Sequence, residues 1–101
     1  MTVRYIATFF SHFGAIRFNK ELEDYDIKGT IKPVPRSLSS SCGTCVEFEI
    51  NFENTEKFSK TQGVIVYEND NGLKIIDKHN EIEQVVEVKE SGYSEIYKAI
   101  Q

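Results

Sequence analysis

The spacing of apolar residues predicts a strand followed by a helix at the start of the chain. Residues 3–10 are rich in β-branched and aromatic side chains, as buried strands are. Ser11 then offers a side-chain oxygen that can cap a helix running to Asp24. The apolar side chains of that segment recur with helical spacing and form one stripe: Ala15, Phe18, Leu22 and Tyr25.

The next segments predict two strands and a short helix. Residues 27–32 favour a second strand, which Pro33 and Pro35 end because proline cannot donate a hydrogen bond to a neighbouring strand. Residues 46–52 alternate between apolar and polar side chains, the pattern of a half-buried strand. Residues 54–60 favour a short helix.

The rest of the chain predicts a hairpin, a strand and a final element that fits two structures. An Asn-Gly pair at 71–72 between the apolar runs 63–68 and 73–77 is a strong hairpin signal. Residues 82–89 favour another strand. The last stretch fits a second hairpin around Ser91-Gly92. Its apolar residues also recur with helical spacing, namely Tyr93, Ile96, Tyr97 and Ile100. We expect a helix there.

This order of elements predicts an α+β fold in one domain over residues 1–101. We expect a ferredoxin-like sandwich, a mainly antiparallel sheet with helices on one face, plus a C-terminal hairpin extension. Residues 1–52 would hold the cysteines, and residues 53–101 would form an acidic extension without an assigned role. In such a sheet the first two strands run parallel with the third between them. That arrangement brings residues 10–14 next to residues 35–45.

Charge and hydropathy narrow the class of protein. The net charge is −4, which argues against a nucleic-acid partner, because phosphate binding needs a basic face. Residues 1–46 carry six basic and four acidic residues, whereas residues 47–101 carry six and twelve. There is no signal-peptide pattern and no apolar run of membrane-spanning length. We therefore expect a cytoplasmic protein with no membrane partner, in a compartment where thiols stay reduced.

The chemistry of the chain is concentrated in its two cysteines, Cys42 and Cys45, which form a C-x-x-C motif. This spacing suits exchange at sulfur, because the second thiol can attack a group attached to the first, or it supplies half of a metal site. Residues 27–46 include three basic residues and no acid, and positive surroundings stabilise a thiolate. We therefore expect Cys42 to be an exposed, readily ionised nucleophile and Cys45 to be a resolving thiol.

Several neighbours are candidates to hold a group attached to Cys42. Hydroxyls and backbone amides of the loop can hydrogen-bond a thiolate or a persulfide, and a nearby guanidinium can add charge. The amides at the start of the first helix add positive potential. The candidate binding residues are Arg36, Ser39, Ser40, Ser41, Gly43, Ser11 and His12.

Three stretches also carry a family resemblance. They are Tyr5-Ile6-Ala7-Thr8-Phe9, Pro33-Val34-Pro35-Arg36 and Ser39-Ser40-Ser41-Cys42-Gly43. Together they resemble the selenium/sulfur carrier-like domain family, over about Val3 to Phe48. The resemblance implies a bacterial cytoplasmic protein whose Cys42 carries sulfur or selenium as a persulfide. A small apolar residue is expected in relatives where Cys45 stands, so the second thiol is a departure that allows thiol–disulfide chemistry.

These considerations lead to one main hypothesis and two alternatives. The main hypothesis is a persulfide carrier, rather than a stand-alone enzyme, that takes sulfur or selenium from a donor enzyme and passes it to an acceptor protein. No cofactor or resident metal is expected for it. The first alternative is a redox protein or regulator that uses exchange between Cys42 and Cys45. The second is an interaction module in which a homodimer shares zinc between two cysteine pairs.

Overall fold

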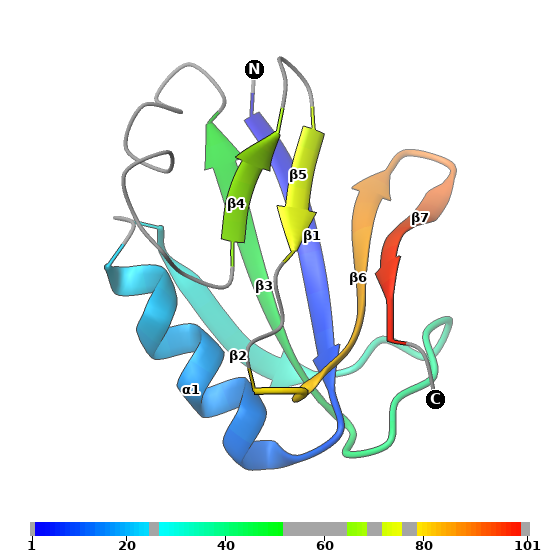
Figure 1. The fold of residues 1–101 in the computed structure, drawn as a ribbon. Coiled ribbons are helices and arrows are strands. Elements are labelled where there is room, and N and C mark those ends of the chain that lie inside the picture. The colour runs from blue at the N-terminus through cyan, green and yellow to red at the C-terminus, as the bar shows by residue number, and fades with distance from the viewer. Residues whose placement is uncertain (1, 25–26, 52–64, 69–71, 76–78, 100–101) are drawn as a thin grey trace.

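The computed structural model describes residues 2–24, 27–51, 65–68, 72–75 and 79–99 (Figure 1). Within these ranges the chain is α+β, as predicted, with one helix and seven strands. In chain order they are β1 (Thr2–Phe9), α1 (His12–Glu23), β2 (Gly29–Pro33), β3 (Thr44–Asn51), β4 (Ile65–Glu68), β5 (Gly72–Ile75), β6 (Ile82–Lys89) and β7 (Gly92–Lys98). No helix in the described part of the chain has the length and apolar character that crossing a bilayer requires.

Five strands form the main sheet, in the order β2-β3-β1-β6-β7, and all neighbours are antiparallel. Because β3 lies between β1 and β2 and is antiparallel to both, those two strands run parallel, as predicted. Their C-terminal residues therefore lie at the same end of the sheet (Figure 1). The predicted hairpin is confirmed as a separate antiparallel pair of β4 and β5. The helix predicted over 54–60 lies outside the described residues, so the ferredoxin-like topology stays a prediction.

The first helix forms where the sequence places its cap and its apolar stripe. Ser11 has extended backbone, and its Oγ accepts a hydrogen bond from the Gly14 amide at 3.2 Å. Ala15, Phe18 and Leu22 are buried, so the stripe faces the sheet, which α1 crosses on one side (Figure 1). Tyr25, the fourth member of the predicted stripe, lies outside the described residues.

The main core lies between α1 and the sheet. The Phe18 ring sits 5.3 Å from that of Phe9 and 5.4 Å from that of Phe48, and Tyr5 stacks on Phe48 at 5.5 Å. Burial of each such side chain contributes about 1.5–3 kcal/mol. In β3 the alternation predicted from the sequence is confirmed, because Phe48 and its apolar partners face the helix while the polar residues face away. We call the side of the sheet opposite α1 the open face.

The prediction of a helix at the end of the chain is wrong, because residues 92–98 form β7, which pairs with β6. Two features explain the error. Gly92 takes a positive φ of 133° in the turn that starts the strand. Val85 pairs with Tyr97 and Val86 pairs with Glu95, so Ile96 is an extra residue in a β-bulge. The bulge interrupts the two-residue period, and the apolar residues on either side of it acquire helix-like spacing.

Candidate functional site

Residues 34–43 form a loop between β2 and β3 that carries Cys42, and we call it the Cys loop. A hydrogen bond from the Val34 amide to the Gly43 carbonyl, at 3.1 Å, closes its base. A second one, from the Leu38 amide to the Pro35 carbonyl at 3.0 Å, forms a turn within it. Gly43 has a φ of 74°, which favours glycine over residues with a side chain. The residue after Cys42 thus sets the direction in which the chain enters β3.

The start of α1 lies beside the base of the Cys loop, as predicted. His12 Nδ1 is 3.3 Å from the Oγ1 of Thr44, the residue that follows the loop. The Ser11 hydroxyl is used in the helix cap. The amides of the first helical turn therefore lie near the cysteine segment, and they contribute positive potential at this end of the sheet.

The Cys42 thiol is free and half-buried. Its Sγ lies 3.5 Å from the Thr44 carbonyl oxygen, to which it donates a weak hydrogen bond. The side chain packs against the core cluster on the helix side of the sheet. Cys42 is therefore partly sheltered, but it is the more exposed of the two cysteines.

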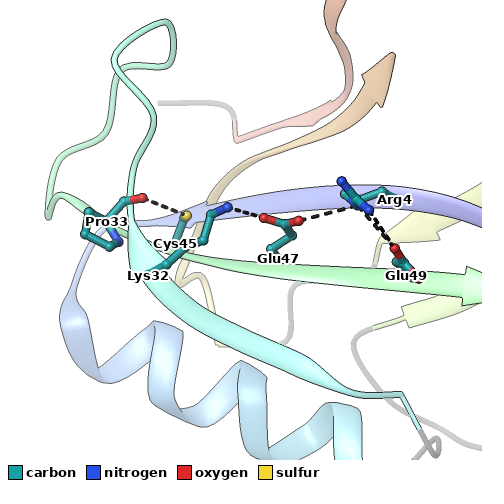
Figure 2. A network of polar contacts seen from close by, with 6 residues as sticks. All are labelled: Arg4, Lys32, Pro33, Cys45, Glu47 and Glu49. Atoms are coloured by element: carbon teal, nitrogen blue, oxygen red, sulfur yellow. Dashed lines mark hydrogen bonds and ion pairs between the residues drawn. The ribbon is translucent and has the colours of Figure 1, made fainter. Parts of the chain in front are cut away.

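The Cys45 thiol is completely buried on the open face. It packs with Ile6 and Val86, and two Cys-loop residues, Val34 and Leu38, cover this cluster. Its Sγ donates to the Pro33 carbonyl at 3.6 Å (Figure 2). Burial raises the pKa of the Cys45 thiol, and the positive charge of Lys32 acts in the opposite direction. In this conformation Cys45 is a protonated core residue rather than a nucleophile.

A row of charged side chains continues from Cys45 along the open face (Figure 2). Lys32 forms an ion pair with Glu47. Arg4 Nε lies 3.4 Å from Glu47 Oε1, and Arg4 Nη2 lies 3.0 Å from Glu49 Oε1. The hydrogen bond to Glu47 raises the pKa of Lys32. Because the Lys32 ammonium group is paired with the Glu47 carboxylate, it stabilises a Cys45 thiolate less than an unpaired ammonium group at this position would.

Two serines of the Cys loop, Ser39 and Ser41, are hydrogen-bonded to β6. Ser41 donates from its amide at 3.1 Å and from its hydroxyl at 2.6 Å to the Glu83 carboxylate. Gln84 Nε2 donates to the Ser39 carbonyl at 3.0 Å. The Ser40 hydroxyl is buried and has no hydrogen-bond partner among the described residues. Residues 27–46 contain no acidic residue, but in the folded protein Ser41 of this segment contacts the acidic side chain of Glu83.

The structure thus brings some candidate residues together and leaves others apart. Arg36 and Gly43 are exposed on the Cys loop, and within the described residues Arg36 makes no ion pair. Sequence reasoning missed Thr44 and Glu83. Glu83 is 42 positions from Ser41, and its sequence surroundings give no sign of the contact. Among the described residues no group of three or more His, Cys, Asp or Glu is placed to hold a metal ion.

The fold and the site define a small α+β protein with one accessible and one buried thiol at one end of an antiparallel sheet. Residues 4–68 match the model of a family described as "putative Se/S carrier protein-like". Because the match covers more than half of the chain, the protein belongs to this family, and the resemblance inferred from the sequence is confirmed. The match also extends beyond Phe48, to the end of β4. No curated protein and no solved structure matches the chain.

Proposed function

We propose that this protein carries sulfur or selenium bound covalently to Cys42, between a donor enzyme and an acceptor protein. The observation that carries this proposal is the contrast in burial between the two thiols, since Cys42 is reachable and Cys45 is sealed in the core. Membership in the carrier-like family supports the same function. The protein would act by presenting a loaded cysteine rather than by catalysing a reaction of its own.

Loading would be an exchange at sulfur. The Cys42 thiolate attacks the outer sulfur of a persulfide on the donor, a new S–S bond forms, and the donor leaves as a thiolate. Unloading is the same step with the acceptor thiolate as the nucleophile. Each transfer moves one sulfur atom without net oxidation, so no external oxidant or reductant is needed. Selenium would follow the same course as a selenopersulfide.

The surroundings of Cys42 support a role in holding such an adduct. The Ser40 hydroxyl is buried and unpartnered among the described residues, so it is a candidate donor to the carried atom. The exposed Arg36 guanidinium and the amide-rich start of α1 are candidates to balance the charge of an anionic adduct. His12, held at Thr44, is a candidate to exchange protons there.

We infer that residues 1–101 form one domain, because β6 and β7 complete the sheet begun by β1 to β3. A ferredoxin-like sandwich fits the parallel arrangement of β1 and β2 around β3. Locating a second helix within residues 52–64 by chemical-shift measurements would test this inference.

The carrier is preferred to the two alternatives. Thiol–disulfide exchange needs Cys45 as a nucleophile, but this thiol is buried and its pKa is raised. A zinc site shared by two copies needs both thiols as exposed ligands, and burial of Cys45 opposes that arrangement as well.

Intact-mass analysis after incubation with a persulfide donor tests the proposal. We expect the protein to gain the mass of one sulfur atom, and a reducing agent to remove it. Cys42→Ser should gain nothing, whereas Cys45→Ser should still be loaded. An equal gain in the Cys42→Ser variant would refute the proposal. If loading depended on Cys45 instead, the redox alternative would take its place.

A further inference from the structure

The carboxylate of Glu83 joins three segments of the chain around the Cys loop. Its Oε1 accepts from Thr8 Oγ1 at 3.3 Å and from the Ser41 amide at 3.1 Å, and its Oε2 accepts from the Ser41 hydroxyl at 2.6 Å. The next residue, Gln84, donates to the Ser39 carbonyl. Both oxygens of this half-buried carboxylate therefore hold the Cys loop to β6, and Oε1 also bonds to β1. Hydrogen bonds to an ionised group are stronger than those between neutral groups.

This fastening determines the position of the residues around both thiols. Ser41 precedes Cys42 directly, so fixing its amide and hydroxyl limits the places that Cys42 can occupy. The same loop lays Val34 and Leu38 over the cluster that contains Cys45. Cys42 packs against the helix-side cluster, and Cys45 belongs to the cluster on the open face. With the loop fastened, the two thiols are directed to different sides of the sheet.

We propose that Glu83 is a positioning residue that keeps Cys45 from attacking the Cys42 Sγ of a loaded persulfide and so releasing the carried sulfur. The proposal rests on the carrier function of Cys42. It gives β6, which follows the segment matched by the family, a direct part in that function. Release of the carboxylate frees Ser41, lifts Val34 and Leu38 from the open face, and exposes the Cys45 thiol beside Lys32.

The reaction that Glu83 prevents is the loss of the cargo as sulfide. The Cys45 thiol gives its proton to solvent, and its sulfur attacks the Cys42 Sγ of the persulfide. A Cys42–Cys45 disulfide forms, the bond from Cys42 Sγ to the outer sulfur breaks, and that sulfur takes up a proton and leaves as hydrosulfide. The Cys45 sulfur is oxidised from the thiol to the disulfide level, and the carried sulfur is reduced to sulfide by the same amount. Cys42 Sγ keeps the oxidation level that it had in the persulfide, so electrons and atoms balance.

The first arm of the test measures exposure of Cys45 without any cargo. In a Cys42→Ser background, Cys45 is the remaining thiol, and its alkylation by iodoacetamide under native conditions reports opening of the loop. We expect Glu83→Ala to speed alkylation about 10- to 100-fold, because hydrogen bonds to a charged group stabilise the closed loop by a factor of this size. Glu83→Gln keeps an acceptor oxygen and should restore most of the protection. Ser41→Ala removes one of the hydrogen bonds and should have a smaller effect.

Two controls separate positioning from a general loss of stability. Glu95→Gln changes an exposed carboxylate on β7 and should leave the alkylation rate unchanged. Ile50→Val weakens the core at the far end of β3, and it should speed alkylation only as far as its measured loss of global stability explains. If Glu83→Ala behaves like Ile50→Val at equal stability, the positioning role is refuted.

The second arm uses protein loaded at Cys42 by a persulfide donor. Glu83→Ala should release sulfide faster than the wild type, by the same factor as its alkylation, and should gain a Cys42–Cys45 disulfide. Adding Cys45→Ser should abolish that release. If Cys45 alkylation stays slow in Glu83→Ala, the inference fails even though Cys42 carries sulfur. If alkylation accelerates but Cys42 is never loaded, the carrier function fails and the role of Glu83 as the fastening of the loop stands.

Discussion

Cys42 and Cys45 are three positions apart in the sequence, yet they differ in burial and in the side of the sheet on which they pack. Cys42 lies at the end of a loop, half-buried, against the helix-side core. Cys45 is the second residue of β3 and is sealed under that loop on the open face. The comparison shows that a C-x-x-C motif is not by itself a dithiol site. Where such a motif crosses into a strand, the sheet separates its two thiols by face and by burial.

Labelling both thiols in the native protein gives the most direct test of their different burial. We expect iodoacetamide to modify Cys42 at least about 100-fold faster than Cys45, because Cys45 reacts only when the loop opens. Peptide mass spectrometry after timed quenching measures both rates in one sample. Unfolding in urea should bring the two rates together. Equal rates in native buffer would contradict the difference in burial.

Truncation of each thiol should affect stability unequally. Cys45→Ala leaves a cavity in a closed cluster and should cost about 1 kcal/mol or more of the free energy of unfolding. Cys42→Ala, at a half-buried loop position, should cost no more than about 0.5 kcal/mol. Urea denaturation followed by circular dichroism measures both values. A larger loss for Cys42→Ala would mean that the loop thiol, not the strand thiol, is the packed one.

The smallest expected effect is a decline of stability at alkaline pH. Burial raises the pKa of the Cys45 thiol above its ordinary value of 9.0, so the unfolded chain loses this proton at lower pH than the folded protein does. The contribution is therefore complete below pH 9.0 and is lost as the pH rises through the folded pKa, by at most about 1.4 kcal/mol per pH unit.

Urea titrations between pH 8 and 10 should show this decline in the wild type and a flatter profile in Cys45→Ala. Tyr5, whose pKa burial raises to about 12, affects stability only at higher pH, above its ordinary value of 10.0. An identical slope in both proteins over this range would show that Cys45 titrates alike in the folded and unfolded chains.

Features governed by local residue order could be predicted from the sequence. The cap at Ser11, the buried stripe of α1 and the alternation in β3 depend on neighbours within one helical turn or one strand. The juxtaposition of the α1 start with the Cys loop also followed, because strand order constrains which ends of a sheet meet. These features identified the part of the molecule that holds the candidate site.

Features governed by distant contacts could not be predicted. The contact between Ser41 and Glu83 depends on β6 lying beside β1, so the segment without acids gave a misleading impression of its electrostatic surroundings. Gly14 is a second example, because helix propensity alone disfavours glycine there. A side-chain carbon at Gly14 would lie 2.9 Å from the Glu81 Cβ, so close packing against the segment before β6 explains the glycine. The bulge at Ile96 is a third, since it changed the spacing on which the helix prediction rested.

The bulge has a consequence for how copies of the protein meet. An exposed outer strand invites open-ended pairing with other chains, and proteins resist this with bulges, prolines and lysines along the border. Here β7 carries the irregularity at Ile96, whereas β2 carries Lys32 and ends at Pro33. Each border of the sheet is thus poorly suited to stacking strand upon strand. The donor and acceptor of the proposed carrier function would therefore meet this molecule at the tip where Cys42 lies rather than along its flanks.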